Sequence, residues 1–249
     1  MCTVSWVRDK AGYSLFFNRD ELRSRKPAAG PELGCHRGIK YIAPRDGDFG
    51  GTWIGVNHFG LILGLLNRFD NAGSGGLNNY TSRGLLLRDL LDCSQHRELA
   101  HRVSSLELNR FRPFTLFAVS SDEPAMLIEW NGLEVRLQSD AEDQIPLSSS
   151  SLKQPDVVSF RKDLFDKMRS EQGALDFQLL ADFHRSHVPE RGPQSICMHR
   201  DEAVTVSLSV VTVTVQTVEF HYYPTSPCQA TSAEELRIER VTGLVTSSP

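Results

Sequence analysis

The chain has 249 residues, of which 40% are hydrophobic and 23% charged, an ordinary balance for a globular protein with a sizeable core. Its 31 acidic and 27 basic side chains give a net charge of -4, so no nucleic-acid binding is expected, because such binding needs a basic surface. Apolar runs such as residues 61–66 are too short to cross a bilayer, so no membrane span is expected.

The five cysteines are odd in number and widely scattered, and the chain does not start with basic residues followed by a long apolar run. This pattern predicts a cytoplasmic protein with reduced thiols. No internal repeat and no clean linker interrupts the sequence. We therefore expect one domain over residues 1–249.

Residues 3–7 and 13–17 are predicted to be strands, and residues 9–12 carry the turn chemistry of a hairpin between them. If Lys10 and Ala11 form the centre of the turn, Cys2 lies opposite Arg19. A three-residue loop would place Cys2 opposite Asp20 instead. In either register the start of the chain meets residues 18–21.

Residues 27–51 are rich in proline and glycine and are predicted to be a loop that contains one short strand, at residues 39–43. A second hairpin follows, with strands at residues 52–57 and 61–67. Residues 71–79 are predicted to be a flexible loop. Leucines at helical spacing then predict a helix over residues 82–92, which Ser82 caps.

Further strands are predicted at residues 114–119 and 126–130, and helices at residues 159–168 and 175–183. Residues 204–223 alternate between apolar and polar side chains. Because the alternation changes phase near Val210, this segment is either a hairpin or a strand with a bulge. The order of elements favours an α+β fold in which helices cover sheets.

Cys2 is the residue most suited to chemistry. Initiator methionine is normally removed before a small second residue, so we expect the mature chain to begin with a free amine on a residue that carries a thiol. An α-amine titrates near pH ~8 and a thiol near ~8.5, so one residue would supply both a base and a nucleophile. Arg19 could lower the pKa of the thiol, and Asp20 could anchor the amine. The alternative is that Cys2 is a small buried hydrophobic residue.

Several motifs resemble those of the NRDE family, which includes transport-and-Golgi-organisation proteins and many bacterial members. The resemblance is strongest in the first 70 residues and extends over most of the chain. It rests on the sequences MCTVSW at residues 1–6, FNRDEL at 17–22, GGTWIGVN at 50–57 and the GL…LN stretch at 60–67.

The NRDE family is in turn similar to N-terminal nucleophile hydrolases of the penicillin V acylase and bile salt hydrolase type. The resemblance implies a four-layer αββα sandwich and a catalytic role for Cys2, with Arg19 and Asp20 beside the thiol. It places Asn67 where those hydrolases have an asparagine that stabilises the oxyanion. Asn67 could instead only end its strand and turn the chain. The residues assigned to substrate binding are Asn18, Glu21, Trp53, Ser149 and Arg200.

The sequence departs from the family pattern at two positions. Ser149 stands where the family has an asparagine, and its hydroxyl is shorter. Val206 stands where an arginine is expected on a strand, and Arg200 is the nearest substitute.

Histidines and cysteines between residues 184 and 199 are a candidate metal site, because His184 and His187 could share a helix face and Cys197 and His199 could join them. Their spacing matches no strong zinc pattern, so polar loop residues are the favoured interpretation and no metal or cofactor is expected. The Cys197–His199 sequence also lacks the second cysteine of a haem attachment motif.

Two hypotheses follow. In the first, the protein is an N-terminal cysteine hydrolase or acyltransferase acting on a small-molecule amide or thioester, such as an acylated amide or acyl-CoA. In the second, it is a non-catalytic relative of such hydrolases that binds or carries haem or a lipid. The sequence leaves the oligomeric state open.

Overall fold

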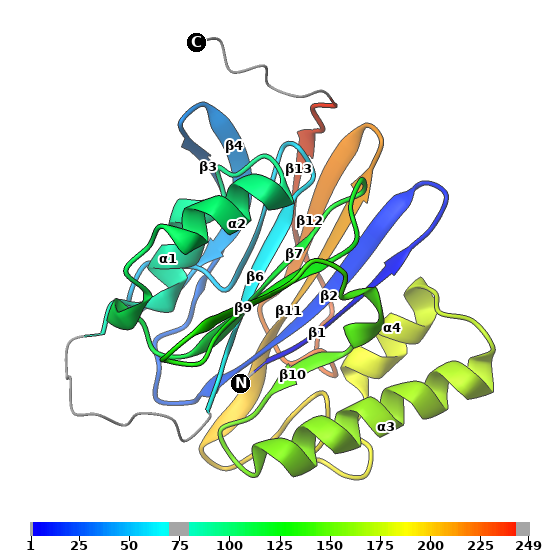
Figure 1. Cartoon of the computed structure of the whole chain (residues 1–249). Coiled ribbons are helices and arrows are strands. Elements are labelled where there is room, and N and C mark those ends of the chain that lie inside the picture. The colour runs from blue at the N-terminus through cyan, green and yellow to red at the C-terminus, as the bar shows by residue number, and fades with distance from the viewer. Residues whose placement is uncertain (1, 70–79, 243–249) are drawn as a thin grey trace.

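The computed structural model describes residues 2–69 and 80–242. Two antiparallel sheets dominate it (Figure 1). In spatial order the first sheet consists of β10 (Leu147–Ser149), β1 (Cys2–Arg8), β2 (Gly12–Leu22), β11 (Ala203–Thr214), β12 (Thr217–Tyr223) and β13 (Glu234–Glu239). The second consists of β3 (Ala29–His36), β4 (Ile39–Arg45), β5 (Ile54–Asn57), β6 (Ile62–Asn67), β7 (Phe114–Val119), β8 (Met126–Trp130) and β9 (Val135–Gln138).

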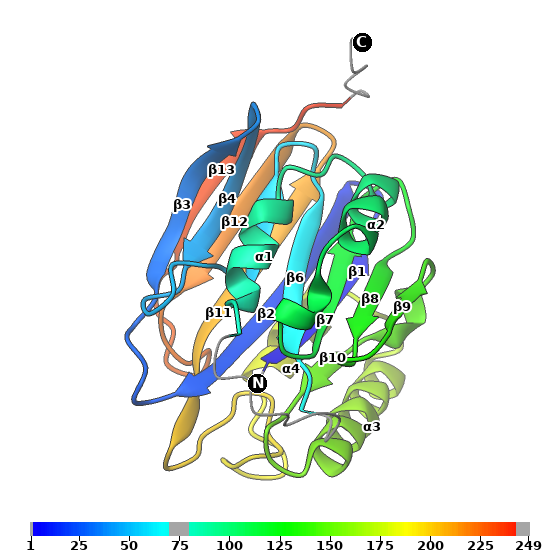
Figure 2. The same ribbon diagram turned by 60° about the vertical axis from the view of Figure 1, so that its left-hand side comes forward.

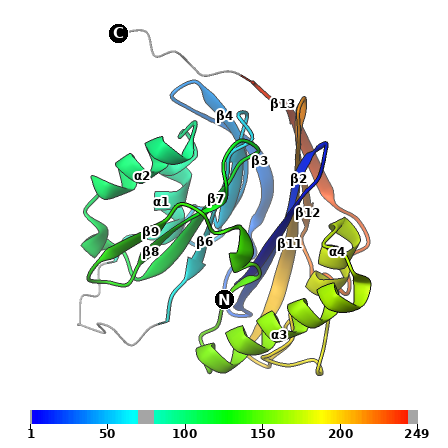
Figure 3. The ribbon, with the colours of Figure 1, turned by 45° about the vertical axis from the view of Figure 1, so that its right-hand side comes forward.

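The helices cover the two outer faces of the paired sheets, so the molecule has four layers. Figure 2 shows α1 (Arg83–Leu90) and α2 (His96–Ser104) lying over the second sheet. Figure 3 shows α3 (Gln154–Gln172) and α4 (Phe177–Arg185) on the far side of the first sheet. The expected α+β fold with four αββα layers is therefore confirmed. None of the helices described here has the length and apolar character needed to span a membrane.

The central strands are buried on both faces because one face meets the other sheet and the opposite face meets helices. In β1, every residue from Cys2 to Val7 is buried. A strand in this position carries apolar or hydrogen-bonded side chains on both sides. The same burial explains the phase change near Val210, because β11 continues through that point with both of its faces covered.

The turn between β11 and β12 comes later, after Thr214, and the bulge lies earlier, between Thr205 and Ser207. The segment therefore contains both of the features that the alternation left open. Val206 is the extra residue of the bulge, since Thr205 pairs with Asp20 and Ser207 pairs with Arg19 across to β2.

The prediction for residues 27–51 was wrong in one respect, because β3 and β4 form a complete hairpin there. β3 lies at the edge of its sheet, where a strand pairs on one side only, so Pro31 removes no bond from a second neighbour. The predicted flexible loop at residues 71–79 lies outside the described residues, as does Met1.

Candidate active site

Cys2 begins β1, which lies between β10 and β2 in the first sheet. It pairs with Arg19 of β2 on one side and with Ser149 of β10 on the other. The two-residue turn in the β1–β2 hairpin thus sets the first of the two predicted registers. Directly paired residues project their side chains to the same face of a sheet, so Cys2 and Arg19 both face the second sheet.

A cavity of about 460 Å³ opens beside Cys2. Six of the predicted site residues line it, and they come from β1, β2, β6 and the segment before β5: Cys2, Arg19, Asp20, Glu21, Trp53 and Asn67. The cavity is within the range of about 300–1,000 Å³ typical of small-molecule sites. Cys2 is 8% exposed and also packs against the hydrophobic core.

The Arg19 guanidinium is fixed against the wall of the cavity. Its carbon lies 3.9 Å from the centre of the Trp53 ring, a cation–π contact between the two sheets. One terminal nitrogen lies 2.5 Å from Asp46 and 3.4 Å from Glu21. Arg25 shares both of these carboxylates. Arg19 is therefore held in one position by three neighbours, which suits a group that orients a substrate or a thiolate.

Asn18 does not reach the cavity, because side chains alternate along β2 and Asn18 points to the helix-covered face. Its amide nitrogen donates to the carbonyls of His184 (2.9 Å) and Ile196 (3.0 Å). These two acceptors fix the amide, so its oxygen faces His184 Nδ1 at 3.1 Å and accepts a hydrogen bond from the Nδ1–H group. His184 Nε2 then accepts from the Ser5 hydroxyl at 2.9 Å. Asn18, for which a substrate-binding role was predicted, therefore does not line the Cys2 cavity.

His184 gives the fold a specific pH dependence. Burial lowers its pKa to about 3, and the charge of Arg161 on α3 acts in the same direction. In the unfolded chain the group titrates near pH ~6.5, so its contribution is present above that pH and is lost as pH falls toward about 3. We expect the difference in unfolding free energy between wild type and His184→Gln to shrink by up to about 1.4 kcal/mol per pH unit below pH ~6.

Urea unfolding at several pH values measures this difference. His101→Gln is the matched control, because His101 is exposed on α2. A difference between wild type and His184→Gln that stays constant from pH ~7 to ~4.5 would contradict the neutral, buried state of His184.

Asp20 lines the cavity, but its carboxylate is held on the helix-covered face of the first sheet. It accepts a hydrogen bond from the Thr205 hydroxyl at 2.6 Å and forms an ion pair of 3.6 Å with Arg161. Arg161 is 1% exposed and also donates to Thr3 Oγ1 at 2.6 Å and to the Ser195 carbonyl at 2.7 Å. Asp20 is therefore better placed to position β2 beside Cys2 than to contact a substrate.

The electrostatic surroundings of Cys2 favour a neutral thiol. Burial raises the pKa of the Cys2 thiol, and the Asp20 charge raises it further, whereas the Asp20 backbone hydrogen bond and the Arg19 charge lower it. Burial is the largest of these effects. A nucleophilic Cys2 therefore needs a base close by, because Arg19 alone does not overcome desolvation.

Asn67 and Ser149 lie on different sides of Cys2. Asn67 is the last residue of β6 and lines the cavity from the second sheet. Ser149 pairs directly with Cys2 but is not among the residues that line the cavity, and its buried hydroxyl has no hydrogen-bond partner within the described residues. Asn67 is thus the only one of the two that faces the space a substrate would occupy.

Arg200 is not brought to the cavity. It lies in the turn before β11, where it forms an ion pair with Glu202 and its carbonyl accepts from Arg23. Val206, the residue at the position of the expected arginine, lies in the β11 bulge and lines a separate cavity.

Besides Arg25, two arginines that line the Cys2 cavity were not predicted from the sequence. Arg83, the first residue of α1, donates to the Pro113 carbonyl at 2.8 Å, and burial lowers its pKa to about 10. Arg112 lies over the Tyr80 ring at 5.3 Å. No sequence signal marks these two residues.

Arg161 was also missed, but the sequence carries a signal for it. It lies four residues from both Val157 and Phe165 on the apolar face of α3, and a charged residue among apolar ones at helical spacing indicates a buried charge.

Comparison with solved structures places this architecture among known folds. The N-acylethanolamine-hydrolyzing acid amidase ortholog of Caenorhabditis elegans matches with a TM-score of 0.60 and 14% identity, over 84% of this chain and 92% of that chain. Penicillin V acylase from Agrobacterium tumefaciens matches with a TM-score of 0.57 and 11% identity, over 96% and 86%. Conjugated bile acid hydrolase from Clostridium perfringens matches with a TM-score of 0.56 and 10% identity, over 96% and 92%.

The fold is therefore that of the N-terminal nucleophile hydrolases. No curated protein matches the sequence. A family model does, over residues 1–230, and its description is Transport and Golgi organisation 2. The chain belongs to this family, which confirms the resemblance found in the sequence.

Proposed function

We propose that the protein is a hydrolase or acyltransferase in which Cys2, as the first residue of the mature chain, attacks the carbonyl of a small-molecule amide or thioester. The observation that carries this proposal is the position of Cys2, at the start of a central strand and in the wall of a cavity shared with Arg19 and Asn67. The hydrolase fold supports the same reaction class.

The proposed reaction has two steps. The free α-amine of Cys2 takes the thiol proton, the sulfur forms a bond to the carbonyl carbon, and the Asn67 amide donates a hydrogen bond to the oxyanion. Collapse of the intermediate breaks the bond to the amine or thiol leaving group, which receives the proton from the α-amine. Water, or an acceptor amine or alcohol, then attacks the acyl-cysteine and gives a proton to the α-amine. The bond between the carbonyl carbon and the sulfur breaks, and the α-amine delivers this proton to the sulfur. Arg19 and Trp53 orient the acyl compound.

The charge of the cavity favours an anionic substrate. Arg19 and Arg25 are balanced by Glu21, Asp46 and Asp48. The described contacts of Arg83 and Arg112, by contrast, are a carbonyl and an aromatic ring. These two guanidinium groups can bind a carboxylate or a phosphate. We therefore propose acyl compounds that carry such a group, acyl-CoA included.

The requirement for a free amine gives a direct test. We expect protein whose intact mass corresponds to a chain starting at Cys2 to hydrolyse members of a library of N-acyl amino acids and acyl-CoA thioesters. The same chain with a Gly-Ser remnant before Cys2 should lose activity by about 10²-fold or more, because its α-amine becomes an amide that cannot act as a base. Equal activity of the two chains would contradict the proposed base.

Binding without turnover is the second candidate, and the burial of Cys2 and the raised pKa of its thiol favour it. In this case the cavity holds haem or a lipid, and Cys2→Ala retains affinity. A titration of both ligands into wild type and Cys2→Ala, alongside the hydrolysis assay, distinguishes the two functions. No binding of either ligand would contradict the second candidate.

A further inference from the structure

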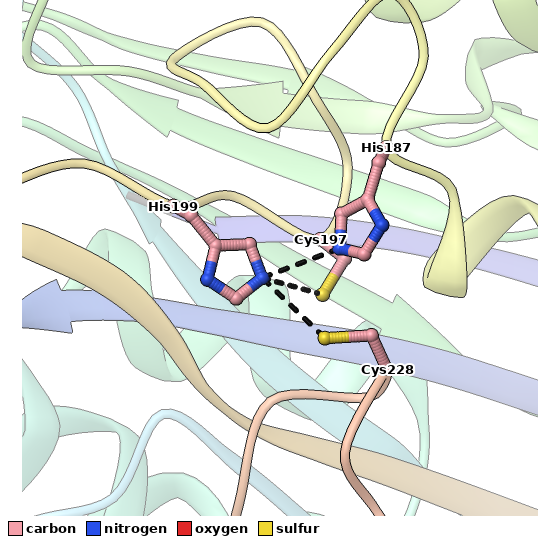
Figure 4. A group of neighbouring side chains, drawn as sticks. All are labelled: His187, Cys197, His199 and Cys228. Carbon is pink, nitrogen blue, oxygen red and sulfur yellow. Dashed lines mark hydrogen bonds between the residues drawn. The ribbon is translucent and has the colours of Figure 1, made fainter.

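Four metal-ligating side chains meet at a place separate from the Cys2 cavity. They are His187, Cys197, His199 and Cys228, and one ligand atom from each lies within 4.8 Å of the others (Figure 4). His187 follows the end of α4, Cys197 and His199 precede β11, and Cys228 lies between β12 and β13. Three separate segments of the chain therefore converge on one point.

The contacts centre on a single atom, His199 Nε2. It lies 3.2 Å from His187 Nε2, 3.5 Å from Cys197 Sγ and 3.4 Å from Cys228 Sγ, as the dashed lines in Figure 4 show. A neutral imidazole nitrogen carries either one proton or one lone pair, so it cannot form three hydrogen bonds at once. Hydrogen bonding within the cluster does not account for this arrangement.

The same distances match the edges of a tetrahedron around a metal ion. Zinc binds imidazole nitrogen at about 2.0–2.1 Å and thiolate sulfur at about 2.3 Å, which separates the ligand atoms of a tetrahedral site by about 3.3–3.8 Å. The three contacts of His199 Nε2, at 3.2, 3.4 and 3.5 Å, are close to these values. Two thiolates with two imidazoles also suit zinc better than the hard ions magnesium and calcium.

We propose that His187, Cys197, His199 and Cys228 bind one zinc ion in a structural Cys2His2 site. Four protein ligands fill the tetrahedral coordination and leave no position for a substrate, which separates this site from the chemistry proposed for Cys2. His184, which the sequence analysis grouped with these residues, does not contribute, because both of its ring nitrogens are used by Asn18 and Ser5.

Hydrogen bonds connect the backbone around the cluster to Asp20 of β2. Cys197 N–H donates to the Ser186 carbonyl at 3.0 Å. Met198, between two of the ligands, donates its N–H to Thr205 Oγ1 at 2.7 Å, and this hydroxyl donates to Asp20. Ser226, two residues before Cys228, donates to the Thr205 carbonyl at 2.7 Å. A metal ion bound by the cluster would therefore stabilise the segments that support Asp20.

Metal analysis of the full chain tests the proposal. Protein purified with a histidine-free tag at its C-terminus, without chelators, should contain about one zinc per chain by plasma mass spectrometry. Cys197→Ser and Cys228→Ser should each retain less than about one tenth of it, whereas the control Cys35→Ser, at an exposed cysteine of β3, should keep all of it. Less than about one tenth of a zinc in wild type, or equal zinc in Cys228→Ser and the control, would overturn the proposal.

Cobalt substitution keeps the test decisive if the serine variants do not fold. Wild-type protein stripped with a chelator and titrated with Co²⁺ should develop the intense visible bands of a tetrahedral site and a thiolate-to-cobalt band, both saturating at one equivalent. Added Zn²⁺ should abolish them. A weak octahedral spectrum, or peptide mapping that finds Cys197 and Cys228 joined as a disulfide in protein isolated under reducing conditions, would overturn the assignment.

Discussion

Replacing Cys2 by alanine is expected to reduce hydrolysis by about 10⁴-fold or more, because removal of a nucleophile leaves only binding and oxyanion stabilisation. The variant should still fold, since alanine fits the strand position and only one sulfur atom leaves the core. Steady-state kinetics on the best library substrate, with circular dichroism as the check of folding, measure both effects.

Cys35→Ala is the matched control for this prediction. Cys35 is an exposed thiol on the edge strand β3, and it is not among the residues that line the Cys2 cavity. We expect unchanged turnover in Cys35→Ala. If Cys2→Ala retained more than about one tenth of wild-type activity while folded, the sulfur of Cys2 would not be the nucleophile.

Replacing Arg161 by methionine is expected to lower the free energy of unfolding by about 3–5 kcal/mol, because it removes the cation from the buried ion pair of Arg161 with the Asp20 carboxylate. The carbonyl of Ser195 and the hydroxyl of Thr3 lose a donor as well. Urea unfolding gives the difference.

The exposed Arg169 lies on the same helix, and Arg169→Met should change stability by less than about 0.5 kcal/mol. Asp20→Asn should recover part of the loss when combined with Arg161→Met, because the amide has no charge to compensate. A loss in Arg161→Met as small as that in the control would show that the ion pair does not hold β2 in place.

The sequence predicted strands well where their hydrophobic residues match the burial that the structure gives them. The predicted strands at residues 114–119 and 126–130 coincide with β7 and β8, which are covered by α2 on one face and the first sheet on the other. The strands it missed lie at the edges of the sheets, and it also missed the helix α2. β9 and β13 end their sheets and carry mostly exposed, polar side chains, so they show little of the hydrophobic periodicity on which prediction depends.

The candidate site was predictable where it depended on a hairpin. The turn residues Lys10 and Ala11 set the register, and the register alone places Arg19 opposite Cys2. Residue alternation along β2 also implies that Asn18 and Arg19 face opposite sides of the sheet. Arg83 and Arg112 could not be found in this way, because tertiary packing alone brings the start of α1 and the segment before β7 to the cavity.

The cluster of two histidines and two cysteines could not be predicted from the sequence either. Cys197 and His199 are two residues apart, but His187 and Cys228 come from segments 10 residues before and 31 residues after Cys197. Such spacing resembles no short zinc motif. The four side chains meet only because β11 and β12 are paired and α4 packs on β1 and β2.

Trapping of the acyl-enzyme is the most direct test of the role of Cys2. Protein with a free Cys2 amine is mixed with its best thioester or amide substrate, quenched in acid within one turnover, digested and mapped by mass spectrometry. We predict that the acyl mass lies on the N-terminal peptide, at the sulfur of Cys2, and that it decays at the rate of product formation. Turnover with no adduct on that peptide, or with the adduct on another residue, would contradict the proposed nucleophile.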